Sequence, residues 1–463
     1  MSQKLILEVS DLVNFRKLIN SRARVAIQEL EAKMLEREEA SRLIILTLLS
    51  RSNMLLIGAP GVAKSFIVKK ASYLVKGGRY FEHMMNYTTK PNELLGVAYE
   101  GENGETLYNT KGSIVDSSIV FLDEVYKGSS EVNNSLLGVM SNYREFHQKG
   151  STRGVVKTEV DALFGASNEF SNDASAAPFN DRFHVRIELF RIKSPENFKR
   201  LLRGDYDKSN DYTVFFKKEE LAMVEAFAKE VDMPPYIEDM IVSIKDRFIR
   251  EKLESSDRKI ENAARIMQVS AFCNNRDAVN VSDVLLFIHT AWNDFAERER
   301  VKIICFDSLF KSKDFFESEV DKQEQTKQKN DNFLNNNMED VFMKRVSLEP
   351  KAISAAFGHW TNNAKTLHDN YVYLDKSFQA FLDNFEHIKN IENTVKDNLF
   401  VIDLLKEETL NIRDPYKRSF DDALISRIED NLVSIRQSRK RLKHFTDNCP
   451  TPSDYSAYRP LSL

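Results

Sequence analysis

Glycine, proline and cysteine are scarce in this chain of 463 residues, which contains 15, 11 and 3 of them. Few glycines and prolines mean few helix breakers, so the sequence predicts a protein rich in helices. The three cysteines, Cys273, Cys305 and Cys449, are far apart and form no CxxC pair. This spacing argues against a zinc site or a disulfide framework and favours a reducing compartment.

Long apolar runs and an excess of one charge are also missing. The apolar run at residues 43–49 is far shorter than the roughly 20 residues that span a bilayer. The first residues lack the apolar stretch of a signal peptide, and we therefore predict a cytoplasmic protein. Basic and acidic residues number 66 and 70, for a formal net charge of -4. Composition therefore gives no general attraction to nucleic acid or anionic membranes.

The first part of the chain alternates predicted helices with short apolar strands. Helices are predicted over residues 9–50 and 65–75, and another begins at Ser194-Pro195. Alternating residues between glycines at 96–112 suggest a hairpin or a loop. Strands are predicted at residues 53–57, 80–87, 118–122, 162–166 and 185–189. Strands that alternate with helices favour a parallel α/β sheet.

Strand signals stop after about residue 195, and the rest of the chain is predicted to be helical. Residues 217–300 suit a small helical lid domain. The polar, Asn- and Gln-rich residues 321–338 indicate a linker or an exposed loop. Apolar residues from Tyr371 to Ile402 recur at spacings of three and four, which predicts one long helix. A second helix at about 420–445 would fold back on it as a hairpin.

The strongest motif lies at residues 58–65, between a predicted strand and a predicted helix. A phosphate chain needs main-chain amides that close around it, so the loop must be tight and free of bulky Cβ atoms. Lys64 would reach the β- and γ-phosphates of a nucleotide, and the Ser65 hydroxyl would bind Mg²⁺. The predicted nucleotide-binding residues of this loop are Gly58, Ala59, Pro60, Gly61, Val62, Ala63, Lys64 and Ser65.

One residue of the loop departs from the usual phosphate-binding pattern, because Ala63 stands where glycine is expected. Alanine is tolerable there if the residue already has near-helical dihedral angles. The alternative interpretation of the whole octet is an ordinary Gly-Pro turn that precedes a helix.

Two carboxylates end the apolar strand that begins at Ile119. Asp123 and Glu124 would lie at the carboxyl edge of the sheet, where ligands bind in open α/β folds. Asp123 would bind both nucleotide and Mg²⁺, holding the metal through water, and Glu124 would polarise the attacking water. Apolar runs that end in two acids are common, but this pair follows the phosphate loop by about 60 residues and in the right order.

An amide and an arginine complete the candidate catalytic residues. Asn168 follows a predicted strand, and beside a γ-phosphate it could orient water, although a simple turn residue is the alternative. Arg182 stands near Phe179 and Phe183, and such an arginine can act as a finger on a neighbour's γ-phosphate. The alternative for Arg182 is a surface salt bridge.

In this order the motifs resemble those of AAA+ ATPases, and within them the MoxR group, most of all its RavA branch. The resemblance covers roughly residues 10–300 and is carried by residues 36–43, 63–65, 121–127, 166–169, 180–183, 256–259, 269–272 and 275–279. It implies an α/β fold with a P-loop AAA+ core, followed by an all-α lid. The predicted domains are a nucleotide-binding domain (1–200), a lid (201–310), a linker (311–340) and a C-terminal helical hairpin (341–463).

The resemblance also implies roles for residues and partners. Asn168 would be the sensor-1 residue, Arg182 the arginine finger, and Arg258 the sensor-2 arginine that touches phosphate from the lid. Members of the family bind ATP and Mg²⁺, form hexameric rings, and often work with a protein that bears a von Willebrand factor A domain. The implied function is ATP hydrolysis at subunit interfaces, which remodels or activates a protein partner.

Two other functions stay open at this point. The chain could be a nucleotide-gated scaffold or adaptor, whose C-terminal helices bind a partner protein. It could also be a nucleic-acid translocase, although the acidic charge balance argues against this. The basic run at residues 436–444 is better explained as the solvated face of a helix than as a nucleic-acid contact.

Overall fold

The computed structural model describes residues 9–309, apart from 103–104, 149–153, 172–175 and 254, together with residues 393–401. All of the described residues belong to one compact unit. The predicted linker, the second C-terminal helix and most of the predicted long helix lie outside the described residues.

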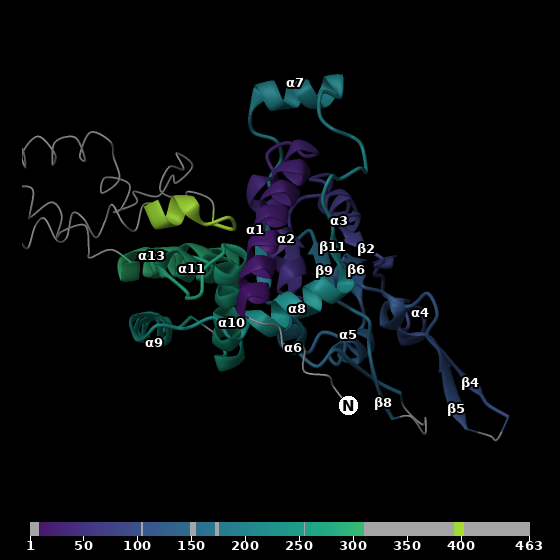
Figure 1. Cartoon of the computed structure of the whole chain (residues 1–463). Coiled ribbons are helices and arrows are strands. Elements are labelled where there is room, and N and C mark those ends of the chain that lie inside the picture. The colour runs from purple at the N-terminus through teal and green to yellow at the C-terminus, as the bar shows by residue number, and fades with distance from the viewer. Residues whose placement is uncertain are drawn as a thin grey trace, which may run out of the picture. The chain divides into compact units, whose positions relative to one another are not determined.

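A five-stranded parallel sheet forms the centre of the unit (Figure 1). Its strands follow the order β10-β1-β9-β6-β3. They are β1 (Asn53–Ile57), β3 (Tyr80–Met84), β6 (Ile119–Asp123), β9 (Ala162–Ser167) and β10 (Val185–Glu188). Strands β1 and β9 are buried along their whole length, as expected of central strands covered on both faces. Ile57 pairs with Ser167 and Met84 with Asp123, so the carboxyl ends of the strands share one edge.

Helices cover the sheet and connect its strands. Helices α2 and α3 pack against each other on one face, where α2 contacts β1 and β10 while α3 contacts β6 and β9. The helices of this half of the chain are α1 (Val9–Ala32), α2 (Glu38–Leu49), α3 (Lys64–Ser72), α4 (Pro91–Leu95), α5 (Ser130–Leu136), α6 (Ala177–Asn180) and α7 (Pro195–Arg203), with the 3-10 turns η1 (Ile114–Asp116) and η2 (Val125–Lys127). Ser194 caps α7 by accepting a hydrogen bond from the Asn197 amide, so the predicted Pro-initiated helix is confirmed.

Three short strand pairs lie outside the central sheet. The hairpin of β4 (Val97–Glu100) and β5 (Thr106–Asn109) confirms the hairpin predicted at residues 96–112, and it extends away from the sheet in Figure 1. The other pairs are β7 (Glu145–His147) with β8 (Val155–Lys157), and β2 (Val75–Lys76) with β11 (Phe216–Lys217). Strand β11 corrects the expectation that strands stop after about residue 195, because two residues are too short to give a periodic signal.

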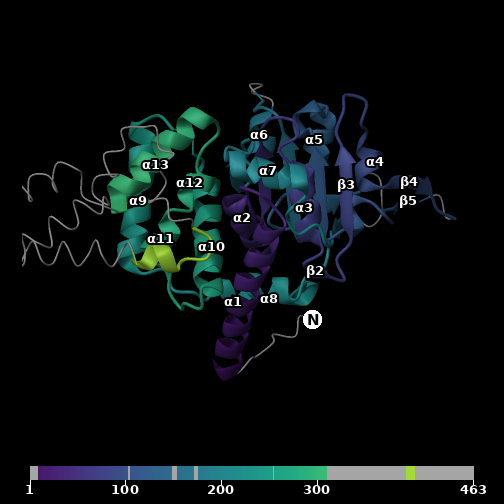
Figure 2. The ribbon, with the colours of Figure 1, turned by 90° about the horizontal axis from the view of Figure 1, so that it is seen from above.

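The helical part that follows is the lid, and its helices α9 to α13 gather to one side of the sheet in Figure 2. The helices of this part are α8 (Lys218–Ala228), α9 (Pro235–Arg250), α10 (Asp257–Cys273), α11 (Val281–Val284), α12 (Phe287–Thr290) and α13 (Phe295–Leu309). Large apolar side chains fill the interior, with Phe248 and Phe287 in edge-to-face contact and Trp292 fully buried. The prediction of an all-helical lid is confirmed.

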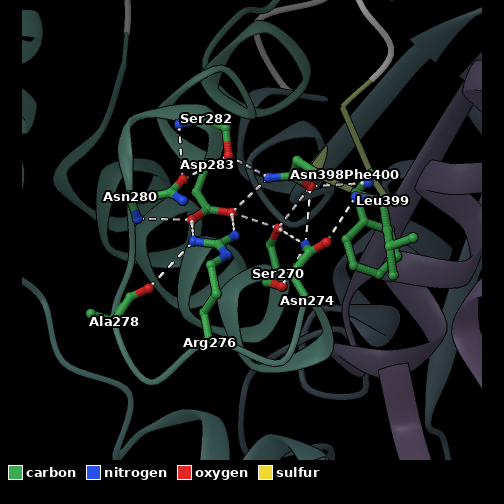
Figure 3. A network of polar contacts seen from close by, with 10 residues as sticks. All are labelled: Ser270, Asn274, Arg276, Ala278, Asn280, Ser282, Asp283, Asn398, Leu399 and Phe400. Atoms are coloured by element: carbon green, nitrogen blue, oxygen red, sulfur yellow. Dashed lines mark hydrogen bonds and ion pairs between the residues drawn. The ribbon is translucent and has the colours of Figure 1, made fainter. Parts of the chain in front are cut away.

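Residues 393–401 pack on this lid, far along the chain from it (Figure 3). Asn398 is buried, and its side-chain amide donates to Ser282 Oγ (2.8 Å) and to Asp283 Oδ1 (2.9 Å). Its Oδ1 accepts from Asn274 Nδ2 at 3.1 Å. A helix covers residues 393–397 and ends there. The prediction of one helix through Ile402 is therefore wrong at this point, because Asn398 turns into the lid.

The predicted fold class, a parallel α/β sheet with flanking helices followed by an all-α lid, is confirmed. None of the helices in the described part of the chain is long and apolar enough to cross a membrane. The two described cysteines, Cys273 and Cys305, are buried free thiols.

Candidate functional site

The loop between β1 and α3 has the shape of a phosphate cradle. A Cβ atom on Gly58 would come within 2.3 Å of the Leu189 carbonyl oxygen, so this position requires glycine. Gly61 has φ +80°, in the left-handed region that glycine adopts freely. Lys64 begins α3, and the free main-chain amides at a helix start favour binding of an anion there.

Ala63 differs from expectation. It has φ 69° and ψ 32°, a left-handed conformation and not the near-helical one that would make alanine comfortable. The expectation is corrected: the loop holds Ala63 where glycine would be unstrained, at a cost of about 1–2 kcal/mol. Such strain is stored at functional sites when the surrounding structure determines the backbone.

A hydrogen-bonded chain joins three of the predicted residues across the carboxyl edge of the sheet. Lys64 Nζ donates to the Gly58 carbonyl at 2.5 Å and to Asn168 Oδ1 at 2.8 Å. Asn168 Nδ2 donates in turn to Glu124 Oε1 at 2.7 Å. Asn168 is therefore part of this constellation and more than a turn residue, and the octet is more than an ordinary Gly-Pro turn.

The electrostatics of the site suit a phosphate and a divalent cation. Burial lowers the pKa of Lys64, against the opposing charges of Asp123 and Glu124. Burial also raises the pKa of Asp123, and the adjacent Glu124 carboxylate adds to this. A bound cation would compensate two carboxylates held so close together.

The donor set fits Mg²⁺ in the way that nucleotide sites use it. Among the described residues, no group of three or more His, Cys, Asp and Glu side chains could hold a metal. Ser65 and Asp123 would therefore supply only part of the coordination shell. Phosphate oxygens and water would supply the rest, which is the usual arrangement for Mg²⁺.

A cavity of about 410 Å³ lies beside the phosphate loop, and sequence reasoning missed it. Its apolar wall includes Met34, Val62, Phe66, Phe198 and Leu201. Apolar walls with a few polar groups are typical of small-molecule pockets of this size. Because it adjoins the loop, this cavity is the candidate site for the base of the nucleotide.

Arg37 lines that cavity, and its neighbour Glu36 binds the start of the α7 segment. Arg37 is buried and donates to the Val62 carbonyl (Nη2, 3.0 Å) and to the Phe190 carbonyl (2.7 Å). Glu36 accepts from the Lys193 and Ser194 amides at 2.7 and 2.9 Å. Burial opposes the charge of Glu36, but these hydrogen bonds outweigh it and lower its pKa. The signal for both residues was their place in the family-like stretch at residues 36–43, which carried no assigned role.

Arg182 lies at the opposite edge of the sheet from Lys64. Asn53, the first residue of β1, donates from its side chain to the Arg182 carbonyl at 2.7 Å. Strand β1 separates this point from the phosphate loop by about 13 Å, at roughly 3.3 Å per residue. An arginine side chain is too short to bridge that distance, so Arg182 does not reach the phosphate loop of its own chain.

The Arg182 guanidinium is half-buried and unpaired within the part of the chain that the structure describes. Its Nε has no hydrogen-bond partner, and none of the ion pairs there includes it. The surface salt bridge is therefore not found. Arg258 lies close by and pairs with Asp181 at 3.3 Å. Burial lowers the pKa of Arg182, and the charge of Arg258 lowers it further.

Two regions of the chain match known families. Residues 21–226 match the MoxR domain of the MoxR-vWA-beta-propeller ternary systems, and residues 236–305 match an AAA lid domain. These matches support a MoxR-type AAA+ module over residues 21–305. The MoxR match ends at residue 226, and the lid match begins at residue 236. The domain boundary that the sequence analysis places after residue 200 stays a prediction.

Relatives of the MoxR-type module support the same assignment of fold. Two uncharacterised proteins of Methanocaldococcus jannaschii are 29% and 28% identical to this chain, over 69% and 60% of it and over 80% and 74% of their own lengths. A presumed ATPase from Cytophaga hutchinsonii has a crystal structure similar to this one, with a TM-score of 0.51 and 16% identity. That similarity covers 63% of this chain and 95% of the other, and it shows the fold alone.

Proposed function

We propose that this MoxR-type chain hydrolyses MgATP at the subunit interfaces of a ring. The observation that supports this most is the division of the site between two edges of one sheet. Lys64, Asn168 and Glu124 lie together at the carboxyl edge, whereas the unpaired Arg182 lies at the amino edge. A subunit built in this way completes its own site only with the amino edge of a neighbour.

At the carboxyl edge each residue has a distinct task. Lys64 exchanges its contacts with carbonyl oxygens and Asn168 for the β- and γ-phosphates. Ser65 and Asp123 would hold Mg²⁺, and the bound ion would neutralise phosphate charge. Glu124 accepts a proton from the attacking water, and Asn168 orients that water.

At the amino edge Arg182 acts as the finger toward the neighbour's γ-phosphate. Arg258 lies at the start of α10 and is tied to Asp181 beside Arg182. A sensor-2 role for Arg258 is therefore proposed toward the same neighbouring nucleotide, and not toward the nucleotide of its own subunit. Two guanidinium groups on one developing charge match the electrostatic demand of phosphoryl transfer.

The biological role of this ATP hydrolysis is proposed from the matched MoxR family. The matched family is described from ternary systems of MoxR, vWA and beta-propeller proteins, and this supports a partner that bears a von Willebrand factor A domain. We propose that a hexameric ring remodels or activates such a partner in the cytoplasm, and the buried free thiols agree with a reducing compartment. Membership of the RavA branch and a scaffold role for the C-terminal helices stay predictions.

Single substitutions and mixed subunits test this proposal together. Lys64→Ala should lose nucleotide binding. Glu124→Gln should bind MgATP normally, but its rate of ATP hydrolysis should fall by about 100-fold or more. Arg182→Ala should also bind and not turn over. Mixing Lys64→Ala with Arg182→Ala subunits should restore hydrolysis. The Lys64→Ala subunit supplies an intact arginine finger, and the Arg182→Ala subunit supplies an intact nucleotide-binding site. Calorimetry and steady-state phosphate release are the measurements.

Matched controls separate these effects from folding. Lys69 and Glu131 are exposed residues on α3 and α5, and Lys69→Ala and Glu131→Gln should behave as wild type. Wild-type turnover by Glu124→Gln would remove that residue from its role. No recovery on mixing, with each variant folded and assembled, would show that the site is complete within one subunit.

A further inference from the structure

Asn53 is a fully buried polar residue at the amino end of β1, where the sheet meets the turn that carries Arg182. The next four residues of this strand are apolar and buried. A buried amide costs free energy unless its polar atoms are hydrogen-bonded, so the contacts of Asn53 show what it is retained for.

Every polar atom of the Asn53 side chain has a partner. The amide nitrogen donates to two carbonyl oxygens, those of Met140 at 2.8 Å and Arg182 at 2.7 Å. The amide oxygen accepts from Arg144 Nη1 at 2.6 Å. The Asn53 carbonyl also accepts from the His184 amide at 2.9 Å. Asn53 thus holds the chain on both sides of Phe183.

Arg144 holds the Asn53 side chain in place through the hydrogen bond to its amide oxygen. It is buried and has φ 54°, a left-handed conformation that a long side chain disfavours. Its second nitrogen, Nη2, donates to the Arg51 carbonyl at 2.6 Å. Among the described residues no carboxylate lies within ion-pair distance of Arg144, so neutral oxygens alone anchor its fork. Burial and the nearby charges of Arg265 and Arg51 lower the pKa of Arg144 to about 9.

Other contacts hold the same turn, among them the Arg182 amide, which donates to the Phe179 carbonyl at 3.1 Å. Arg186 Nη2 donates to the Asn180 carbonyl at 2.7 Å. The Phe183 ring is buried so closely against Gly165 that a Cβ on that glycine would come within 2.7 Å of it. The main chain of Arg182 is therefore fixed while its guanidinium is left unpaired. A fixed main chain with an unpaired guanidinium allows an arginine to contact a defined point on another molecule.

We propose that Asn53 is a positioning residue for the arginine finger. Held by Arg144, Asn53 fixes where the main chain of Arg182 lies at the amino edge of the sheet and in which direction its side chain extends. This inference rests on the proposed function, because it assigns Asn53 to the site of the neighbouring subunit. Asn53 acts on catalysis through Arg182 and has no contact with a nucleotide of its own.

Asn53→Asp in the full-length chain is the most informative change. Aspartate keeps the oxygen that Arg144 uses but replaces the amide that donates to the Arg182 carbonyl. Turnover should fall about 10- to 100-fold, because a finger displaced by about 1 Å is inefficient. Affinity for MgADP should stay as in wild type, because the phosphate loop lies at the other end of β1. Phosphate release and calorimetry measure the two quantities.

Mixed subunits show which half of the site has failed. Asn53→Asp subunits should regain activity when mixed with Lys64→Ala subunits, which supply an intact finger. They should gain nothing from Arg182→Ala subunits, which supply none. The opposite pattern, or a loss of MgADP affinity, would overturn the proposal, because Asn53 would then support the phosphate loop. The mixture of Lys64→Ala with Arg182→Ala is measured alongside, and its failure would count against the ring interface and not against Asn53.

Two further variants guard against misfolding. Arg144→Lys keeps the charge but loses the fork that holds Asn53, and it should show the same mixing pattern in a milder form. Asn20→Asp is the matched control, because Asn20 also donates to a main-chain carbonyl, that of Cys273, far from the turn. Wild-type turnover is expected for Asn20→Asp. A fall in turnover there equal to that of Asn53→Asp would mean that general destabilisation explains both.

Discussion

Ala63 and Glu124 lie on either side of the phosphate site with backbone conformations that their side chains disfavour. Ala63 has φ 69° and Glu124 has φ 53°. At Glu124 the left-handed turn directs the chain away from strand β6, and the carboxylate meets Asn168. Strain of this kind persists only where the surroundings fix the backbone, and here such residues stand at two points of the proposed catalytic site.

Ala63→Gly should stabilise the protein by about 0.5–1 kcal/mol, because glycine removes the left-handed strain but adds entropy to the unfolded chain. Thermal or urea unfolding without nucleotide measures this. Ala59→Gly is the control, because Ala59 has no positive φ and should lose stability instead. An Ala63→Gly protein less stable than wild type would show that the loop is not strained at this residue.

At the scale of elements, the segment that contains α7 is tied to the end of α1. Lys33 Nζ pairs with Asp207 Oδ2 at 2.5 Å, and the Lys33 side chain is almost fully buried. The same ammonium group lies over the Tyr212 ring, 4.7 Å from its centre. Helix α7 itself has no buried residues, so its position depends on such ties at its two ends. Glu36 supplies the tie at the start of α7, and Asp207 supplies the tie after its end.

Acid should weaken the Lys33–Asp207 contact. The hydrogen bond from Lys33 lowers the pKa of Asp207 from 3.8 to about 2. A lowered carboxyl pKa stabilises the folded state above the unfolded value, and that stability is lost as the pH falls from about 4 to about 2. Asp207→Asn should therefore lower the melting temperature at pH 7 and weaken its dependence on pH between 4 and 2.

The control for this prediction is Asp205→Asn, because Asp205 is exposed on the same segment and forms no ion pair among the described residues. Its acid dependence should match that of wild type. If Asp207→Asn also matched wild type over this range, the Lys33 pair would contribute nothing to the stability of the segment.

At the scale of the whole molecule, the lid is built from two distant parts of the chain. Residues 393–401 lie in the same compact unit as the lid helices, although sequence analysis placed them in a separate C-terminal domain. Val395 and Phe400 are buried there, and Asn398 contacts both Asn274 and Asp283. A boundary drawn at residue 340 would therefore remove part of the lid.

Truncation tests this composition of the lid. A chain that ends at residue 402 should melt close to the full-length protein, whereas one that ends at residue 392 should melt lower by about 5 °C or more. Burial of Val395 and Phe400 is worth about 1.5–3 kcal/mol each, and 1 kcal/mol corresponds to about 2–4 °C in a domain of this size. Scanning calorimetry is the measurement.

Point changes refine the same test. Asn398→Ala should give a smaller loss than the truncation at residue 392, because it leaves the Asp283 carboxylate with fewer donors but keeps the apolar contacts. Asp397→Ala, at an exposed position, should have no effect. Equal melting temperatures for the chains ending at 392 and 402 would mean that the segment only rests on the lid.

Much of the site followed from the sequence because its signals are local. The phosphate loop lies between a strand and a helix that adjoin it in the sequence. Asp123 ends a strand of five residues, and Glu124 follows it directly. Parallel pairing brings such strand ends to one edge, so Lys64, Asn168 and Glu124 met as their order predicted. The dihedral angles of Ala63 could not be predicted from its sequence neighbours, because the conformation of the whole loop imposes them.

The sequence by itself determined the α/β alternation, the helical lid and the residues of the phosphate loop, since periodicity and motif order need only neighbouring residues. Only the tertiary structure decided that Arg182 lies at the edge opposite Lys64, that a cavity adjoins the loop, and that Asn53 and Asn398 bind distant parts of the chain. These features depend on which buried polar atoms meet across the packed interior. Asn53 and Arg182, for example, are 129 positions apart, and no periodic pattern records such a pairing.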